Sequence, residues 1–152
     1  MKKTTIILLY SFVVFTGCKK ESDAPTQEAR TRTEILTSHT WQVKELISQL
    51  GNTQGRYVKG GINSTGSDYS KARLIFNSNG TGTSTDPLMH TWTMTWSFVP
   101  GDETKMTLVI NYPTPATLNL AFVEIDETKF TYTIYYIESG QNALATAENI
   151  PL

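Results

Sequence analysis

The sequence has a single cysteine, Cys18, among its 152 residues. No intrachain disulfide can form, and no cluster of thiolates can hold a metal ion. Histidine is almost as rare: His39 and His90 are the only two, and they lie far apart in the chain. They lack the short spacing that paired histidine ligands of zinc have in common. We therefore expect no metal site and no cofactor.

Positive charge is also scarce. Lys and Arg together number 13 against 14 Asp and Glu, so the formal net charge is −1, and no stretch of the chain is rich in basic residues. Binding to nucleic acid requires clustered cations that neutralise phosphates. We expect no nucleic-acid partner.

Motifs for catalysis are missing as well. No Gly-x-Ser-x-Gly sequence surrounds Ser38-His39, and Gly60-Gly61 does not lead into the Gly-Lys-Ser/Thr of a phosphate-binding loop. The adjacent acids Asp102-Glu103 and Asp126-Glu127 lie in predicted turns, whereas a glycosidase needs two separated carboxylates in one pocket. We expect no catalytic residues and a protein that is not an enzyme.

No apolar run in the sequence is long enough to cross a bilayer. The run from Ile6 to Phe15 has ten residues, whereas a membrane-spanning helix needs about 20. A basic start at Lys2-Lys3 and the small residue Gly17 complete the pattern of a secretory signal peptide. The Gly17-Cys18 junction resembles the lipobox of bacterial lipoproteins. That resemblance implies that residues 1–17 are removed and that the thiol of Cys18 carries the lipid that joins the protein to a membrane.

Residues 18–28 are polar and contain almost nothing to bury, so they are predicted to form a flexible tether. Residues 29–152 are predicted to form one domain. Acidic residues soon after the cysteine resemble the surface-export signal of lipoproteins in the Bacteroidetes. The expected location is therefore the outer membrane, with a lipid anchor and with the domain on the periplasmic or the cell-surface side.

Residues 28–37 are predicted to form a short helix, and strands follow. In the segment from Thr91 to Phe98, large apolar residues alternate with Thr and Ser, which is the period of a half-buried strand. Asn79-Gly80 is typical of a tight hairpin turn, because both residues tolerate positive φ. By the same criteria, strands are predicted at residues 41–47, 56–59, 74–76, 81–85, 91–98, 106–112, 117–125 and 129–137.

The remaining segments have little pattern. Residues 51–70 contain Gly51, Gly55, Gly60, Gly61 and Gly66 and are predicted to be a long loop around the short strand at 56–59. The residues from Glu138 onwards are polar and weakly patterned and are predicted to be frayed.

About eight strands joined mostly by short turns favour an all-β, antiparallel up-and-down meander. A long twisted meander with one apolar face can close on itself, which removes its exposed edges. The prediction is a lipocalin-like barrel of about eight strands with a short N-terminal helix, and a two-sheet sandwich is the alternative. The faces opposite the apolar ones are rich in Thr, Ser and Asn, which are unsuited to lipid.

Three motifs have the order and spacing of a known family. They are Leu36-Thr-Ser-His-Thr-Trp41, Phe76-Asn-Ser-Asn-Gly80-Thr81 and a strand with two tryptophans from Trp92 to Trp96. The segment that contains them resembles the lipocalin-like domain of small lipoproteins of the Bacteroidetes type. The resemblance implies a lipocalin-like barrel. Because Trp41 opens the first predicted strand directly after a short helix, we expect it to be a structural residue that closes one end of the barrel, and not a ligand contact.

The aromatic residues of two predicted strands are the main candidates for a binding site. Small barrels either fill with side chains or hold one small ligand. Because Trp41 begins the first strand and the fifth strand of a meander runs parallel to it, Trp92 is expected near Trp41 and Trp96 near the open end. The candidate ligand-binding residues are Trp96, Phe98, Tyr132 and Tyr136.

Two functions remain open on the sequence alone. In the first, the barrel binds a small apolar or glycan ligand. In the second, a filled barrel serves as a structural or accessory subunit and binds a protein partner through loops such as residues 51–70.

Overall fold

The computed structural model describes residues 29–138 and 140–152. The predicted signal peptide, the tether and Cys18 lie outside the described residues. In the part of the chain that is described, no helix has the length and apolar character needed to cross a membrane.

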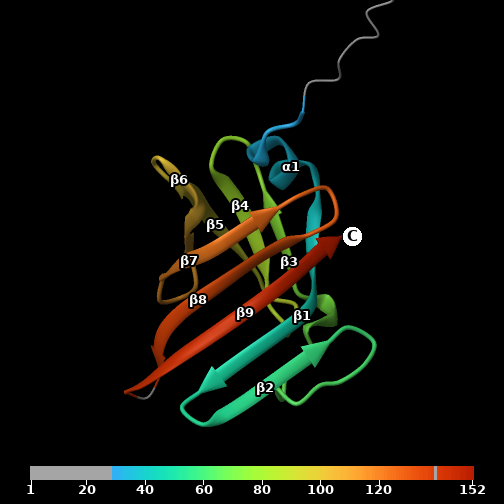
Figure 1. Cartoon of the computed structure of the whole chain (residues 1–152), viewed down its shortest axis with the longest axis vertical. Coiled ribbons are helices and arrows are strands. Elements are labelled where there is room, and N and C mark those ends of the chain that lie inside the picture. The colour runs from blue at the N-terminus through green and yellow to red at the C-terminus, as the bar shows by residue number, and fades with distance from the viewer. Residues whose placement is uncertain (1–28, 139) are drawn as a thin grey trace, which may run out of the picture.

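The regular secondary structure of the described chain is mostly β-strand (Figure 1). Its elements are, in chain order, α1 (Arg32–Ser38), β1 (Thr40–Leu50), β2 (Thr53–Val58), the 3₁₀ turn η1 (Tyr69–Lys71), β3 (Arg73–Phe76), β4 (Thr81–Thr85), β5 (Thr91–Val99), β6 (Asp102–Ile110), β7 (Ala116–Ile125), β8 (Phe130–Glu138) and β9 (Gln141–Pro151).

Eight of the nine strands form a closed antiparallel barrel, and the all-β barrel prediction is confirmed. The strand order is β1-β3-β4-β5-β6-β7-β8-β9, and β9 pairs back onto β1. Both edges of the meander are thereby paired, which is the advantage of closure over an open sheet. The two-sheet sandwich is wrong.

Helix α1 covers one end of this barrel (Figure 1). It starts later than predicted because Thr31 caps it: the Thr31 side chain accepts from the Glu34 backbone N–H, and the Glu34 carboxylate accepts from the Thr31 N–H. This reciprocal arrangement is a capping box. Leu36, on the inner side of the helix, is fully buried. We call this the α1 end and the opposite end, where β1 and β4 finish, the open end.

The extra strand, β2, lies outside the barrel. The first residues of β1 (Thr40–Gln42) pair with β3, whereas the later residues (Glu45–Leu50) pair with β2. The hairpin of β1 and β2 therefore extends past β3, at the bottom of the view in Figure 1. Because β3 is the antiparallel neighbour of β1 within the barrel, β5 runs antiparallel to β1 and not parallel to it.

The prediction of a frayed C-terminal segment is wrong. Strand β9 has 11 residues and pairs with both β8 and β1. Its inward positions are Ala143, Ala145, Ala147 and Asn149, all buried. Small inward residues alternate with outward Leu144 and Ile150, so the hydrophobic pattern that marks the other strands is inverted here.

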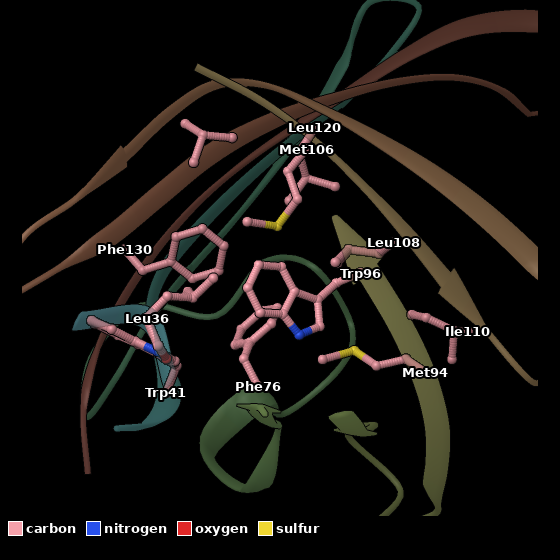
Figure 2. Close-up of a cluster of buried hydrophobic side chains, with 11 residues drawn as sticks. Leu36, Trp41, Phe76, Met94, Trp96, Met106, Leu108, Ile110, Leu120 and Phe130 are labelled. Atoms are coloured by element: carbon pink, nitrogen blue, oxygen red, sulfur yellow. The ribbon is translucent and has the colours of Figure 1, made fainter. Parts of the chain in front are cut away.

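The core fills the α1 end of the barrel with aromatic and sulfur-containing side chains (Figure 2). Trp41, Phe130, Phe76 and Trp96 form a chain of edge-to-face contacts with ring centroids 5.6–5.7 Å apart, the preferred geometry for aromatic pairs. Gly82 makes room for this core, because a Cβ there would collide with the Ile75 carbonyl oxygen and lie 2.7 Å from Met94 Cε.

Candidate ligand cavity

A cavity of about 190 Å³ lies inside the barrel, on the side of the core that faces the open end. The strands contribute apolar walls, among them Leu46, Leu74, Leu108 and Leu118. It extends to the 3₁₀ turn η1 and to the loop between β4 and β5, which contribute Tyr69 and Pro87. Ala147 of β9 leaves part of this space free, because it stands opposite Tyr132, where a larger side chain would fill the cavity.

Trp41 forms part of the inner end of the cavity. It is fully buried, and its indole Nε1 donates to the Leu36 carbonyl oxygen at 2.8 Å. This bond satisfies a carbonyl at the C-terminal end of α1, which helices otherwise leave without a partner. Trp41 thus joins the helix to the barrel, as expected, and also contacts the cavity, which was not expected.

Asn149 is the buried polar residue of the inner end. It is 1% exposed, and its Nδ2 donates to the Phe130 carbonyl oxygen at 3.0 Å. This donation fixes the orientation of the amide, so the other atom is the acceptor Oδ1. Among the described residues Oδ1 has no hydrogen-bond partner. A buried acceptor without a partner is unfavourable, and native proteins contain few of them.

Three tyrosines, Tyr69, Tyr112 and Tyr132, bring hydroxyl groups to the cavity wall. Burial raises the pKa of each above that of an ordinary phenol. For Tyr132, burial is the main cause, the Asn149 side chain offsets part of the effect, and the resulting pKa is about 12. These hydroxyls are therefore uncharged and can donate or accept hydrogen bonds.

The raised pKa of Tyr132 makes the barrel less stable in strong base. The folded state keeps the phenol proton up to about pH 12, whereas the unfolded chain releases it near pH 10. The folded state then binds more protons, so the free energy of unfolding should fall as the pH rises from 10 to 12. We expect a loss of about 1 kcal/mol by pH 11 from this residue. Urea unfolding at pH 9, 10 and 11 should show a smaller fall for Tyr132→Phe than for the wild type; equal falls would contradict the assignment.

The mouth of the cavity carries two charged residues. Arg73 Nη1 donates to the carbonyl oxygens of Ser70 and Ala72 at 2.9 and 2.7 Å. Asp86 accepts from the backbone N–H groups of Leu88 and His90 at 2.8 and 3.0 Å. Both side chains thus stabilise the loops that surround the opening.

The predicted positions of Trp96 and Phe98 are wrong. Trp96 packs on Phe76 and Phe98 in the core, and its Nε1 donates to the carbonyl oxygens of Asn77 and Thr81. The Arg32 guanidinium of α1 lies 5.8 Å from the centre of the Phe98 ring. Both residues are therefore at the α1 end and line no part of the cavity. The direction of β5 relative to β1 is the opposite of the predicted one, because the prediction counted β2 as a barrel strand and β2 lies outside the barrel.

The other predicted residues lie in different surroundings. Tyr132 lines the cavity. Tyr136, four residues further along β8, is 39% exposed near the open end. Trp92, predicted to lie near Trp41, instead packs on Tyr112 (5.5 Å) and His90 (6.2 Å) at the open end. Its Nε1 is buried and has no hydrogen-bond partner among the described residues.

Several cavity residues were not identified from the sequence. Asn149 and Ala147 belong to the segment that was predicted to be frayed, and Tyr69 to the long loop. The alternation of Ala143, Ala145, Ala147 and Asn149 was the available signal. It is weak because alanine contributes little to a hydrophobic pattern.

The histidines and paired acids lie apart from the cavity or at its edge. His39 is 3.3 Å from Glu127 at the α1 end, and His90 is 3.2 Å from Asp86 at the open end. Lys105 and Thr104 hold the pKa of Asp102 at about 2, and Asp126 caps its turn by accepting from Thr128 and Lys129. Within residues 29–138 and 140–152, no three side chains of the metal-ligating types gather in one place.

The geometry defines a small antiparallel barrel with a filled α1 end and a mainly apolar cavity towards the open end. Comparison of the sequence with models of protein families gives no match, and no curated protein matches it.

Proposed function

We propose that this chain is a non-enzymatic, lipid-anchored protein of the bacterial outer membrane whose barrel binds a small apolar molecule. The observation that carries the proposal is the cavity between the core and the open end. Its lining combines aliphatic side chains with a few polar groups, which is the usual composition of a small-molecule site. The resemblance of residues 35–137 to lipocalin-like lipoproteins supports the same function.

The size of the cavity limits the ligand. Its volume is about 190 Å³, and an engineered protein cavity of about 150 Å³ holds one benzene molecule. A single substituted ring or a short branched chain therefore fits. The mainly apolar lining favours an apolar ligand over a glycan, since a sugar would lose hydrogen bonds to water at most of its hydroxyls.

Titration with toluene, and with glucose as the glycan probe, tests this function. Toluene should bind with a Kd of about 1 mM or lower, measured from shifts of backbone amide signals in NMR spectra and referred to free ligand. Ala147→Leu should abolish binding, because its side chain would occupy the cavity. Thr117→Leu, on the exposed face of β7, is the matched control and should bind like the wild type. If glucose binds and toluene does not, the proposed ligand is a glycan and not an apolar molecule.

The anchor is tested separately. A sequence with the features of a lipobox should lead to removal of residues 1–17 and to acylation of Cys18. Acyl chains hold a protein to a membrane in proportion to the apolar surface that they bury, and more than one chain is needed for stable attachment. Intact-mass measurement of the mature protein should give the mass of a lipid-modified Cys18 N-terminus, and Cys18→Ala should prevent this modification. An unmodified Cys18 in the mature wild type would contradict the proposal.

A second function, binding of a protein partner through the loops, is favoured by one observation. In the loop between β4 and β5, Leu88 and Met89 are 75% and 67% exposed, and Ile62 in the loop after β2 is 58% exposed. Leu88 and Met89 are adjacent in the chain, and contiguous exposed apolar residues are typical of interaction surfaces. If neither toluene nor glucose binds, this second function becomes the better one.

A further inference from the structure

Resting on the proposed function, we propose that the cavity selects an uncharged molecule with one hydrogen-bond donor, such as a hydroxyl on a single ring. The donor would enter first and bind Asn149 Oδ1 at the inner end of the cavity. The apolar remainder would lie among the aliphatic walls.

Asn149 requires a donor. Its side chain lines the cavity and is 1% exposed, its Nδ2 is occupied by the Phe130 carbonyl oxygen, and its Oδ1 has no partner among the described residues. A buried acceptor is stabilised by any donor that reaches it, whereas an apolar group placed against it leaves it unsatisfied. A ligand with a donor therefore gains more at this position than a ligand of the same shape without one.

The charges around the cavity disfavour an anionic ligand. Asn149 presents an acceptor oxygen, which repels a carboxylate, and the tyrosine hydroxyls provide no cation. Arg73 lies at the mouth and already donates to two carbonyl oxygens, and Asp86 stands there with it. Transfer of an ionised carboxylate into this interior would be strongly unfavourable without a paired cation. An uncharged donor meets none of these obstacles.

The experiment compares phenol, anisole, toluene and benzoate, which have one ring each and differ in the substituent. Phenol has a donor, anisole has the same oxygen without the hydrogen, toluene has neither, and benzoate is charged. We expect phenol to bind about tenfold more tightly than anisole and toluene, equivalent to about 1.4 kcal/mol, and benzoate not to bind. These four measurements use the wild-type protein, so they need no variant to fold.

Variants then locate the acceptor. In Asn149→Leu, phenol and toluene should bind with about the same Kd. The proposal would be overturned if Tyr132→Phe lost the preference for phenol over toluene while Asn149→Leu kept it. The acceptor would then be the Tyr132 hydroxyl. Equal binding of phenol, anisole and toluene, or binding of benzoate as tight as that of phenol, would also overturn it and leave the proposed function standing. Failure of all four ligands to bind would instead reject the proposed function itself.

Discussion

Replacement of Trp41 by alanine should lower the free energy of unfolding by about 3–5 kcal/mol. Trp41 is completely buried and packs edge-to-face on Phe130, with ring centroids 5.7 Å apart. The substitution removes this packing, leaves a cavity and deprives the Leu36 carbonyl oxygen of its donor. The total free energy of unfolding of a single domain is about 5–15 kcal/mol, so the variant should be close to unfolding at 25 °C. Urea denaturation measures the difference.

A pair of conservative substitutions separates hydrogen bonding from packing. Trp41→Phe keeps an aromatic ring but loses the bond to Leu36. Trp92→Phe removes an indole N–H that has no partner among the described residues. Loss of a satisfied buried bond is unfavourable, whereas loss of an unsatisfied donor is nearly neutral. Trp41→Phe should therefore be the more destabilising of the two.

For Trp41→Ala, a change of less than about 1 kcal/mol in the free energy of unfolding would mean that the residue is not buried as described.

Removal of β9 should abolish the barrel. A chain truncated after Gly140 lacks the strand that pairs with β8 on one side and with β1 on the other. Two strand edges then become exposed, which promotes aggregation, and the cavity and core lose one wall. We expect no cooperative urea transition and no near-ultraviolet circular dichroism signal from packed aromatic residues.

The matched control is deletion of Leu152 alone. This residue is 73% exposed and contributes one backbone bond, from its N–H to the Thr40 carbonyl oxygen at 2.9 Å. Its loss should change the free energy of unfolding by about 1 kcal/mol or less. A truncated chain that still unfolds cooperatively would contradict the role of β9 in closing the barrel.

The strands with bulky inward residues could be predicted from the sequence. In β5, Trp92, Met94, Trp96 and Phe98 lie on the inner face, as their spacing indicates, because period-two alternation reflects one buried face. The turn at Asn79-Gly80 was equally accessible, and Gly80 has the positive φ of 80° that such a turn requires. Local patterns of this type do not depend on which strands pair.

The pairing partners of β1 could not be predicted in the same way. Strand β2 pairs with β1 and with no other strand of the sheet. No local feature of its sequence distinguishes it from the strands that form the barrel. This one difference decides the direction of every later strand relative to β1, and it reversed the expected positions of Trp92 and Trp96. The cavity could not be predicted either, because it depends on Ala147 of β9 standing opposite Tyr132 of β8.

The pairing of β1 with β9 also affects how the protein folds. Gln42 and Pro151, which are joined by a side-chain hydrogen bond, are 109 residues apart in sequence. Folding rates fall as the mean sequence separation of contacting residues increases, because distant segments must meet before their contacts can stabilise them. The hairpins from β3 to β8 involve neighbouring segments and can form early. Closure of the barrel must wait for β9, so β1, made first of all the strands, is completed by the strand that is made last.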